Sequence, residues 1–466
     1  MEAHTRSWRP RPGPGPGPNR ARAAEAGLLV LAVAITLCGH AYQSLAVTGS
    51  LPPDMAVFSV VVAGAVLAAH LAVRRFAEHA DPLLLPVTAL LSGIGLVLLY
   101  RLDAAYEAEF DAPAVAPVQL VWCGVGVAVC VTVVVRLKDY RRLQRYLYLT
   151  TAAALVLLGA PALSSGDTYG AKRWIVLGPM SFQPGEFVKI MMATCCAGYL
   201  VTHRDALALT GRRLLGVRLP RGRQLGPIAL VWLACLFVLA FERDLGTALI
   251  FFGLFVITLY VATGRTGWIA CGLLMAAVGA GVVGSFESYV QSRVVAWLHP
   301  FDIFLPEEQR PKGLISDQLA QALFSFGSGG LTGTGLGGGH PEMIKFAGRS
   351  DFVLTTVGEE LGLTGVTAVL LLYALLVQRG LRTALMARDP FGKLLATGLA
   401  VEMALQVFVV TGGVTGLIPL TGKALPFLAQ GGTSLVANWL LVALLIKISD
   451  GARRHLPAEA EHGDSG

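Results

Sequence analysis

Residues Gly170–Lys189 read GAKRWIVLGPMSFQPGEFVK, a polar and aromatic segment between two long apolar runs. Its first half carries Lys172, Arg173 and Trp174 in succession. Cations and tryptophan are typical of the interface between membrane and water, where they meet lipid headgroups. The segment therefore predicts a membrane protein with a functional surface at one membrane face. Simple headgroup anchoring is the alternative role for the three residues.

The composition places the rest of the chain in a membrane as well. Of the 466 residues, 54% are hydrophobic and 14% are charged, and the mean hydropathy is +0.63. A soluble domain of this size would need far more charge to cover its surface. Since a helix needs about 20 apolar residues to cross a bilayer, we predict an all-α polytopic protein with about twelve transmembrane helices. They are expected near 26–47, 56–73, 83–100, 114–135, 146–163, 186–202, 226–242, 246–263, 267–285, 353–378, 394–418 and 432–448.

The basic residues indicate the topology. They occur in every second connection, and short loops rich in Lys and Arg face the cytoplasm. We therefore expect a multi-pass protein of the cytoplasmic membrane with both termini in the cytoplasm. The net charge of +7 is explained by these loops and does not indicate a nucleic-acid partner. The basic connections are Arg74-Arg75, 136–145, 204–223, Arg265, 379–393 and Arg453-Arg454.

This topology places residues 164–185 and one large extracellular loop, 286–352, outside the cell. Long loops in compact folds are usually functional or disordered. The mixture of aromatics, carboxylates, cations and glycine turns in 286–352 favours a functional loop. Its glycine-rich stretch Gly327–Gly339 lacks the Gly-Lys-Ser/Thr end of a nucleotide-binding loop. The seven cysteines form no Cys-x-x-Cys pair, so the sequence predicts no metal site built on them.

Charged residues within the apolar runs are candidate functional groups, because charges at membrane depth are expensive. Glu186 and Lys189 share one helical face, although a purely structural ion pair is the alternative. Asp244 follows Glu242-Arg243 and precedes Leu-Gly-Thr, so it is either a helix N-cap or part of a water-lined break. This interruption leaves open whether 226–263 is two spans or one broken helix. Lys423 lies between two prolines in a passage expected to be ordered and non-helical.

Asp302 in the large loop is the candidate general base. It follows Arg293 and the sequence Trp297-Leu-His-Pro-Phe. If Trp297 and Phe301 screen its carboxylate from water, its proton affinity would rise towards the working pH. Simple solvation is the alternative for any loop acid, and Glu307, Glu308 and Asp317 compete for the role.

Four motifs resemble the RodA/FtsW family of peptidoglycan polymerases, also called the shape, elongation, division and sporulation family. The similarity is closest to actinobacterial RodA-type members and runs from about residue 83 to the end. The resemblance implies a core of about ten helices plus two additional ones at the N-terminus. Residues 1–25, with their Pro-Gly repeat, are expected to form a disordered cytoplasmic tail. Two added helices (26–80), a polymerase-type core (81–450) and a cytoplasmic C-terminal tail (451–466) would follow. The motifs are Gly170–Lys189, Asp244–Ala248, Ser350–Phe352 with Gly358–Gly362, and Pro419–Ser434.

The resemblance implies a peptidoglycan glycosyltransferase that polymerises lipid II at the outer face of the membrane. It gives Asp302 the role of the base that deprotonates the acceptor hydroxyl. It also implies a class B penicillin-binding protein as partner and leaves room for a divalent cation, Mg²⁺ or Mn²⁺. A lipid II flippase and a non-catalytic scaffold for the penicillin-binding protein are the alternatives. The substrate-binding residues expected are Lys172, Arg173, Trp174, Glu186, Lys189, Asp244, Arg293 and Lys423.

The chain departs from the family pattern in three places. Gly185 replaces the serine of QPSEF, and Glu242-Arg243 replaces the Gln-Pro of QPDLGT. The DPxGxGYQ motif after the aspartate is replaced by the longer and more charged Ile303–Asp317. The third departure keeps Glu307, Glu308 and Asp317 open as the base.

Overall fold

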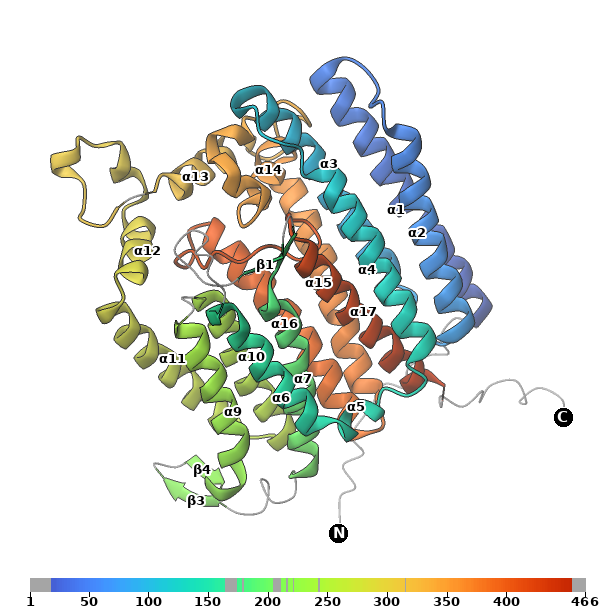
Figure 1. The fold of residues 1–466 in the computed structure, drawn as a ribbon, viewed down its shortest axis with the longest axis vertical. Helices are drawn as coiled ribbons and strands as arrows, with labels where there is room; N and C mark the ends of the chain where they lie inside the picture. The colour runs from blue at the N-terminus through green and yellow to red at the C-terminus, as the bar shows by residue number, and fades with distance from the viewer. Residues whose placement is uncertain are drawn as a thin grey trace, which may run out of the picture.

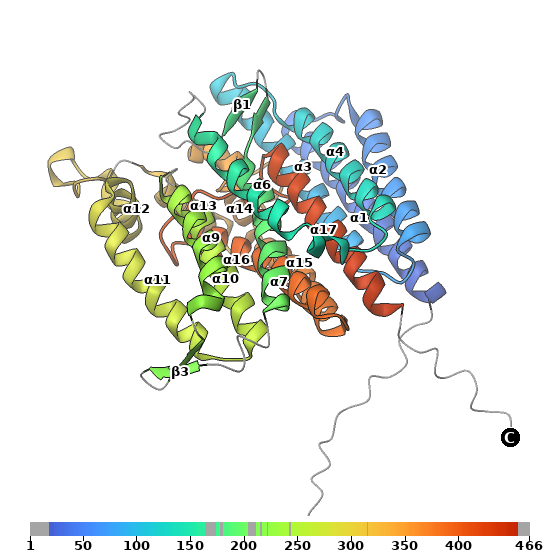
Figure 2. The ribbon, with the colours of Figure 1, turned by 60° about the horizontal axis from the view of Figure 1, so that its bottom comes forward.

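The computed structural model describes residues 18–163, 174–177, 180–203, 211–214, 217–220, 222–241, 244–314 and 316–454. Long helices form a bundle (Figures 1 and 2). At one edge lie α1 (Pro18–Thr48) and α2 (Met55–Phe76), and at the opposite edge lie α11 (Gly267–Phe286) and α12 (Ser288–Leu298). The predicted all-α polytopic fold is confirmed. Among the described residues, the strands form two short antiparallel hairpins, β1 (Ile175–Leu177) with β2 (Met180–Phe182) and β3 (Gly211–Leu214) with β4 (Val217–Pro220).

Each of the twelve predicted spans coincides with helical structure. Within the described residues, nine helices are long and apolar enough to cross a membrane. The helices α6, α7 and α9 are not among the nine, so the count of twelve stays a prediction. The helices at the predicted spans are α1 (Pro18–Thr48), α2 (Met55–Phe76), α3 (Leu84–Phe110), α4 (Ala116–Arg136), α6 (Leu147–Gly159), α7 (Pro184–Thr202), α9 (Gly222–Phe241), α10 (Leu245–Thr263), α11 (Gly267–Phe286), α14 (Val353–Glu360) with α15 (Gly362–Met386), α16 (Pro390–Val414) and α17 (Gly432–Arg453).

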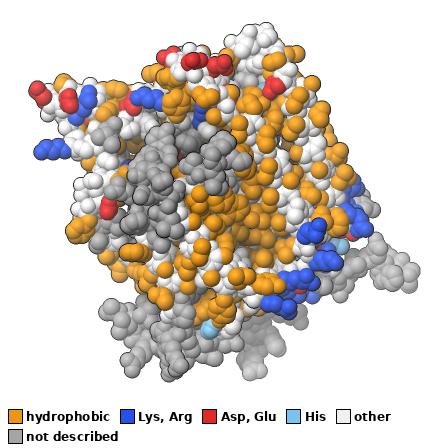
Figure 3. Space-filling model, viewed as in Figure 1, with side chains coloured by type: hydrophobic (Ala, Val, Ile, Leu, Met, Phe, Trp, Pro, Cys, Tyr) orange, Lys and Arg blue, Asp and Glu red, His pale blue; other side chains and the backbone are white. Residues whose placement is uncertain are grey.

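Hydrophobic and charged side chains occupy different parts of the surface along the helices. Hydrophobic side chains cover the middle of the face in Figure 3, and Lys and Arg gather at one end, beside the short helix α5 (Arg142–Arg145). We call this the basic end. Most of the Asp and Glu visible on this face lie towards the opposite end, which carries α13 (Gln318–Gly329). An apolar belt between two polar ends is the surface expected of a membrane-spanning bundle.

Two predicted spans have helix breaks with identifiable causes. The region 226–263 forms two helices, because Asp244 accepts a hydrogen bond from the backbone N–H of Thr247 and caps α10. The span 353–378 is divided into α14 and α15, where the chain turns at Gly362 with φ +66°. A Cβ at this glycine would lie 2.4 Å from the backbone nitrogen of Gly333, so both the turn and the close approach require glycine.

Small residues let the central helices approach closely, as is common in membrane bundles. Gly126 of α4 lies under Trp439 of α17, and Gly432 of α17 lies against Trp122 of α4. At another crossing, Gly95 of α3 faces the backbone of Phe427, where an added Cβ would lie 2.3 Å from the carbonyl oxygen. Gly95 thus allows the α16–α17 connection (residues 415–431) to pack directly against α3.

We expect Gly95→Ala to destabilise the protein by about 1–3 kcal/mol, because its methyl group meets backbone that cannot turn away. The thermal unfolding midpoint of the purified protein in detergent measures the effect. Gly124→Ala is the matched control, since a Cβ at Gly124 of α4 would have no other atom within 4 Å. Equal midpoints for both variants would show that the connection moves freely at this crossing.

The second half of the large loop is fixed to α3 by two buried ion pairs. Arg101 pairs with Glu360 at 2.7 Å and donates to the carbonyl of Gly339 at 2.9 Å. Asp103 pairs with Arg349 at 2.9 Å, and its other oxygen accepts the N–H groups at the start of α4. The loop there consists of α13 and η4 (Pro341–Arg349), which pack on each other and on α14. The acids of the Gly358–Gly362 motif therefore hold the loop in place.

At the basic end, the α2–α3 connection contacts α15 and the last helix, α17. Asp81 pairs with Arg453 of α17 and, at 3.8 Å, with Arg379 of α15. The backbone N–H of His79 donates to Asp450 of α17 at 3.0 Å. These contacts join parts of the chain that lie about 370 residues apart.

Candidate functional site

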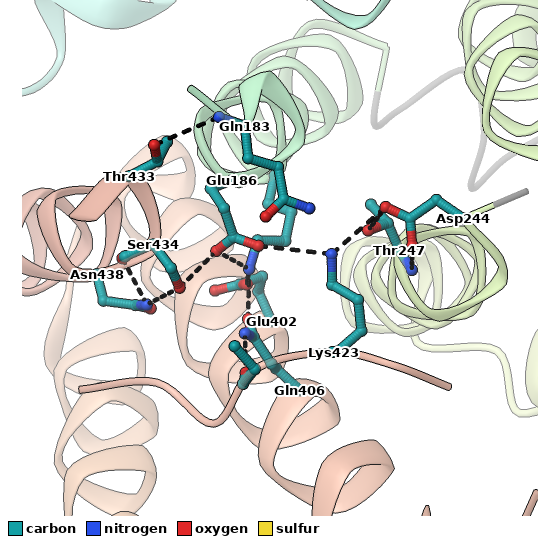
Figure 4. Close-up of polar contacts among 12 residues, drawn as sticks. Gln183, Glu186, Asp244, Thr247, Glu402, Gln406, Lys423, Thr433, Ser434 and Asn438 are labelled. Atoms are coloured by element: carbon teal, nitrogen blue, oxygen red, sulfur yellow. Dashed lines mark hydrogen bonds and ion pairs between the residues drawn. The ribbon is translucent and has the colours of Figure 1, made fainter. Parts of the chain in front are cut away.

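A cluster of charged side chains lies inside the bundle, where α7, α10, α16 and the α16–α17 connection meet (Figure 4). We call it the buried charge cluster; its members are Glu186, Lys189, Asp244, Glu402 and Lys423. None of the five residues is more than 3% exposed. Three carboxylates face two ammonium groups, which leaves a formal excess of one negative charge among these described residues.

Helix α7 supplies the first pair. Pro184 opens the helix, which suits proline because the first turn needs no donor from it. Glu186 and Lys189 then lie one turn apart with their charged atoms at 3.1 Å, as the spacing predicts. Glu186 also accepts a hydrogen bond of 2.9 Å from Ser434 of α17.

Helix α16 encloses Lys189 from the other side. Glu402 lies 2.8 Å from the Lys189 ammonium, and Gln406, one turn later, accepts a hydrogen bond from it. The amide of Gln406 donates to the carbonyl of Ala424 at 2.9 Å. Lys189 is therefore surrounded by polar partners, and the same helix anchors the α16–α17 connection.

Lys423 joins α7 to α10. Its ammonium lies 3.5 Å from Glu186 and 3.4 Å from Asp244. Asp244 in turn accepts from the hydroxyl of Thr247 at 2.8 Å. Gly246 leaves room for the lysine stem, since a Cβ there would lie 2.4 Å from it. The predicted non-helical passage thus places the ammonium group of Lys423 inside the bundle.

The outer loop is attached to the same connection. Helix α12 (Ser288–Leu298) places Arg293 so that it donates to the carbonyl of Leu420 at 2.6 Å. One turn later, the indole N–H of Trp297 donates to the carbonyl of Gly416 at 2.7 Å. The connection therefore accepts a hydrogen bond from Arg293 of the outer loop and itself carries Lys423 of the buried charge cluster.

We expect Trp297→Phe to weaken the attachment of α12 by about 0.5–1.5 kcal/mol, because it removes one hydrogen bond and keeps an aromatic ring. Faster hydrogen exchange confined to α12 would show the effect. Trp268→Phe is the control, because Trp268 lies at the start of α11, outside the outer loop. Unchanged exchange in α12 after Trp297→Phe would mean that Arg293 alone holds the helix.

Asp302 lies apart from the buried charge cluster. It belongs to the short helix η2 (Pro300–Phe304), its side chain is 38% exposed, and it pairs with His299 at 3.1 Å. The indole N–H of Trp297 is bonded to Gly416, and the screening of Asp302 by this ring stays a prediction. Phe301 packs on Phe324 of α13. Asp302 is thus an accessible carboxylate with a histidine beside it.

The competing acids Glu307, Glu308 and Asp317 lie elsewhere in the large loop. Glu307 and Glu308 lie exposed in η3 (Glu307–Gln309). Asp317 precedes α13 and pairs with Lys345 at 3.7 Å. None of the three has a described contact with the buried charge cluster or with Arg293.

The hairpin of β1 and β2 covers the start of α7. Trp174 immediately precedes β1 and is half-buried. Next to β2, the N–H of Gln183 donates to the hydroxyl of Thr433 at 3.3 Å, which ties the hairpin to α17. Lys172 and Arg173 lie outside the described residues, as do Glu242 and Arg243.

The structure thus brings together four of the predicted residues, Glu186, Lys189, Asp244 and Lys423, and links Arg293 to them through one connection. Glu402 and Gln406 were missed. A signal was present, because Glu402 is the one charged residue in the predicted span 394–418 and Gln406 follows at helical spacing.

Comparisons with known proteins agree over most of the chain. The model of the family FTSW_RODA_SPOVE, described as "Cell cycle protein", matches residues 82–454. The chain is 46% identical over 393 residues to the peptidoglycan glycosyltransferase RodA of Mycobacterium tuberculosis (strain ATCC 25618 / H37Rv), covering 83% of this chain and 82% of that one. It is 34% identical over 387 residues to the probable peptidoglycan glycosyltransferase FtsW of Trichlorobacter lovleyi, covering 81% and 95%.

Two solved structures have the same fold. A chain from a peptidoglycan synthase complex that coordinates polymerization and crosslinking matches with a TM-score of 0.62 and 25% identity, covering 80% of this chain and 98% of that one. The rod shape determining protein RodA of Thermus thermophilus matches with a TM-score of 0.52 and 25% identity, covering 79% and 96%.

Proposed function

This chain belongs to the FtsW/RodA/SpoVE family of cell cycle proteins and is a peptidoglycan glycosyltransferase, and from this premise we propose that it polymerises lipid II into glycan strands at the outer face of the cytoplasmic membrane. The observation that carries the proposal is the 46% identity to a named peptidoglycan glycosyltransferase over 83% of the chain. The large loop is attached to the α16–α17 connection, which carries Lys423 of the buried charge cluster. This attachment supports a reaction centre between the loop and the cluster.

The reaction joins two lipid-linked sugars. Asp302 takes the proton from the acceptor hydroxyl, whose oxygen attacks the anomeric carbon of the donor. The bond from that carbon to the pyrophosphate oxygen breaks, and undecaprenyl pyrophosphate leaves with the electron pair. An exposed carboxylate on a loop suits this role because the acceptor must reach it from the membrane surface.

Cations near the outer face would hold the pyrophosphate as charge develops on it. We assign this role to Arg293, with Lys172 and Arg173 of the 164–185 segment, and propose that the neighbouring Trp174 contacts the same substrate. Arg293 retains further N–H donors beyond the one that bonds Leu420.

The buried charge cluster supports the site from within the membrane. Lys189 and Lys423 lie in ion pairs with Glu186, Glu402 and Asp244, so they reach a pyrophosphate only by exchanging those partners. We propose that they bind substrate through such an exchange. In its absence the pairs fix the α16–α17 connection that carries Arg293.

A divalent cation would need ligands from the substrate. Among the described residues, no group of three His, Cys, Asp or Glu side chains could hold a metal. Mg²⁺ is often bound through one or two carboxylates together with substrate phosphates. Asp302 would supply such a carboxylate, and a Mg²⁺ or Mn²⁺ ion would neutralise charge on the leaving pyrophosphate.

The remaining proposals concern orientation and partner. The basic loops support a cytoplasmic position for both termini. The family match begins at residue 82, which supports α1 and α2 as an N-terminal addition. The likeness to a chain of a peptidoglycan synthase complex supports a crosslinking partner, which we take to be a class B penicillin-binding protein.

The test is polymerisation of purified lipid II by the full-length protein reconstituted with its penicillin-binding partner. We expect glycan strands from the pair, resolved by gel electrophoresis. Strands that form only when a second polymerase is added would contradict the proposal. Transfer of labelled lipid II across vesicles without polymer would instead favour the flippase.

A further inference from the structure

An open cavity of about 390 Å³ lies towards the basic end of the bundle. Helices α4, α7 and α17 form most of its wall, and α5 and α6 complete it. The packing of α17 on α4 and of α6 on α7 leaves this space between the two pairs. The wall is mainly apolar and includes Thr132 and Val133 of α4, Ile190 and Met191 of α7, and Leu440 and Leu444 of α17.

The mouth of the cavity is cationic. Arg136, the last residue of α4, lines it and is exposed. In the part of the chain that the structure describes, no carboxylate pairs with Arg136. Leu143 of α5 also lines the cavity, and Arg142 and Arg145 flank this leucine in sequence. An apolar space thus opens beside Arg136, at the end of the bundle where Lys and Arg gather (Figure 3).

We propose that this cavity binds an anionic phospholipid, with an acyl chain between α4, α7 and α17 and the phosphate at Arg136. Apolar walls need a hydrocarbon occupant, and the arginine needs an anion, so one amphiphile meets both requirements. A free phosphate would leave the apolar walls empty.

The bound lipid would touch a helix that contributes to the buried charge cluster. Ile190 and Met191 follow Lys189 directly in α7, so an acyl chain against them packs beside the helix that holds Glu186 and Lys189. Binding itself does not depend on the glycosyltransferase activity and is measured without it.

Native mass spectrometry of the full-length protein, delipidated in detergent, tests the proposal. We would titrate phosphatidylglycerol, phosphatidylcholine and undecaprenyl phosphate, each separately. We expect a preference for phosphatidylglycerol that Arg136→Gln lowers about fivefold, the effect of one arginine on an anionic lipid. Thr132→Trp, at an exposed position of α4 that lines the cavity, should remove both adducts by filling the space.

Arg382→Gln is the matched control, because Arg382 of α15 is also exposed and does not line the cavity. It should leave binding unchanged, and each variant should keep the thermal midpoint of the wild type. Equal losses from Arg136→Gln and Arg382→Gln would overturn the site in favour of general surface charge. Adducts that survive Thr132→Trp would place the lipid elsewhere, and a preference for undecaprenyl phosphate over phosphatidylglycerol would overturn the proposed occupant.

Discussion

Replacing Asp302 by Asn should lower lipid II polymerisation by about 10²–10⁴-fold, the range that a general base contributes. The amide keeps the shape of the carboxylate and cannot accept the proton of the acceptor hydroxyl. The rate of glycan formation by the protein with its penicillin-binding partner is the measurement.

The surroundings of Asp302 make the variant easy to interpret. Its side chain is 38% exposed, and its described ion pair is with His299 on the same short segment. Surface changes of this kind usually alter stability by less than about 0.5 kcal/mol, so the loss of activity should occur at an unchanged thermal midpoint. His299→Ala removes the same ion pair and serves as a further control. It should change the stability by at most about 1 kcal/mol, because exposed ion pairs contribute no more than that.

The other loop acids provide the comparison. Glu307→Gln, Glu308→Gln and Asp317→Asn should each retain most of the activity if Asp302 is the base. Full activity of Asp302→Asn together with loss in one of these three would move the base to that residue. Such a result would leave the enzyme class intact and correct only the site.

Lys189→Met should destabilise the protein by about 3–5 kcal/mol, the typical cost of leaving a buried charge without its partner. The ammonium of Lys189 lies between Glu186 and Glu402, and the cluster already carries an excess of negative charge. Methionine is similar in length, so the effect arises mainly from charge. Thermal unfolding in detergent measures the change.

A second variant separates charge from packing. Lys189→Met combined with Glu402→Leu removes the carboxylate whose described ion pair is with Lys189 alone, and it should recover part of the lost stability. A double variant less stable than Lys189→Met would show that Glu402 is held by packing or by a proton and does not depend on the lysine. Full stability of the single variant would contradict the ion-pair account of the cluster.

The sequence predicted the helices well because bilayer thickness and apolar run length are directly related. It also identified Glu186, Lys189, Asp244 and Lys423, since a charge in an apolar run is conspicuous. Their common location could not be predicted, because helix packing brings together residues from α7, α10 and the α16–α17 connection. The partner of the Trp297 indole could not be predicted for a similar reason. The direction of Trp297 is set by the carbonyl of Gly416, about 120 residues later in the chain.

The contacts at the basic end have a consequence for biosynthesis. The N–H of His79 and the carboxylate of Asp81 find their partners in Asp450 and Arg453, which are made about 370 residues later. At roughly 5–20 residues per second, this is a wait of about 20–75 s. During that time the early helices are already in the membrane while their polar ends remain unmatched. The arrival of the last helix therefore completes the fold at the basic end, and a chain that ends before Asp450 lacks both of these partners.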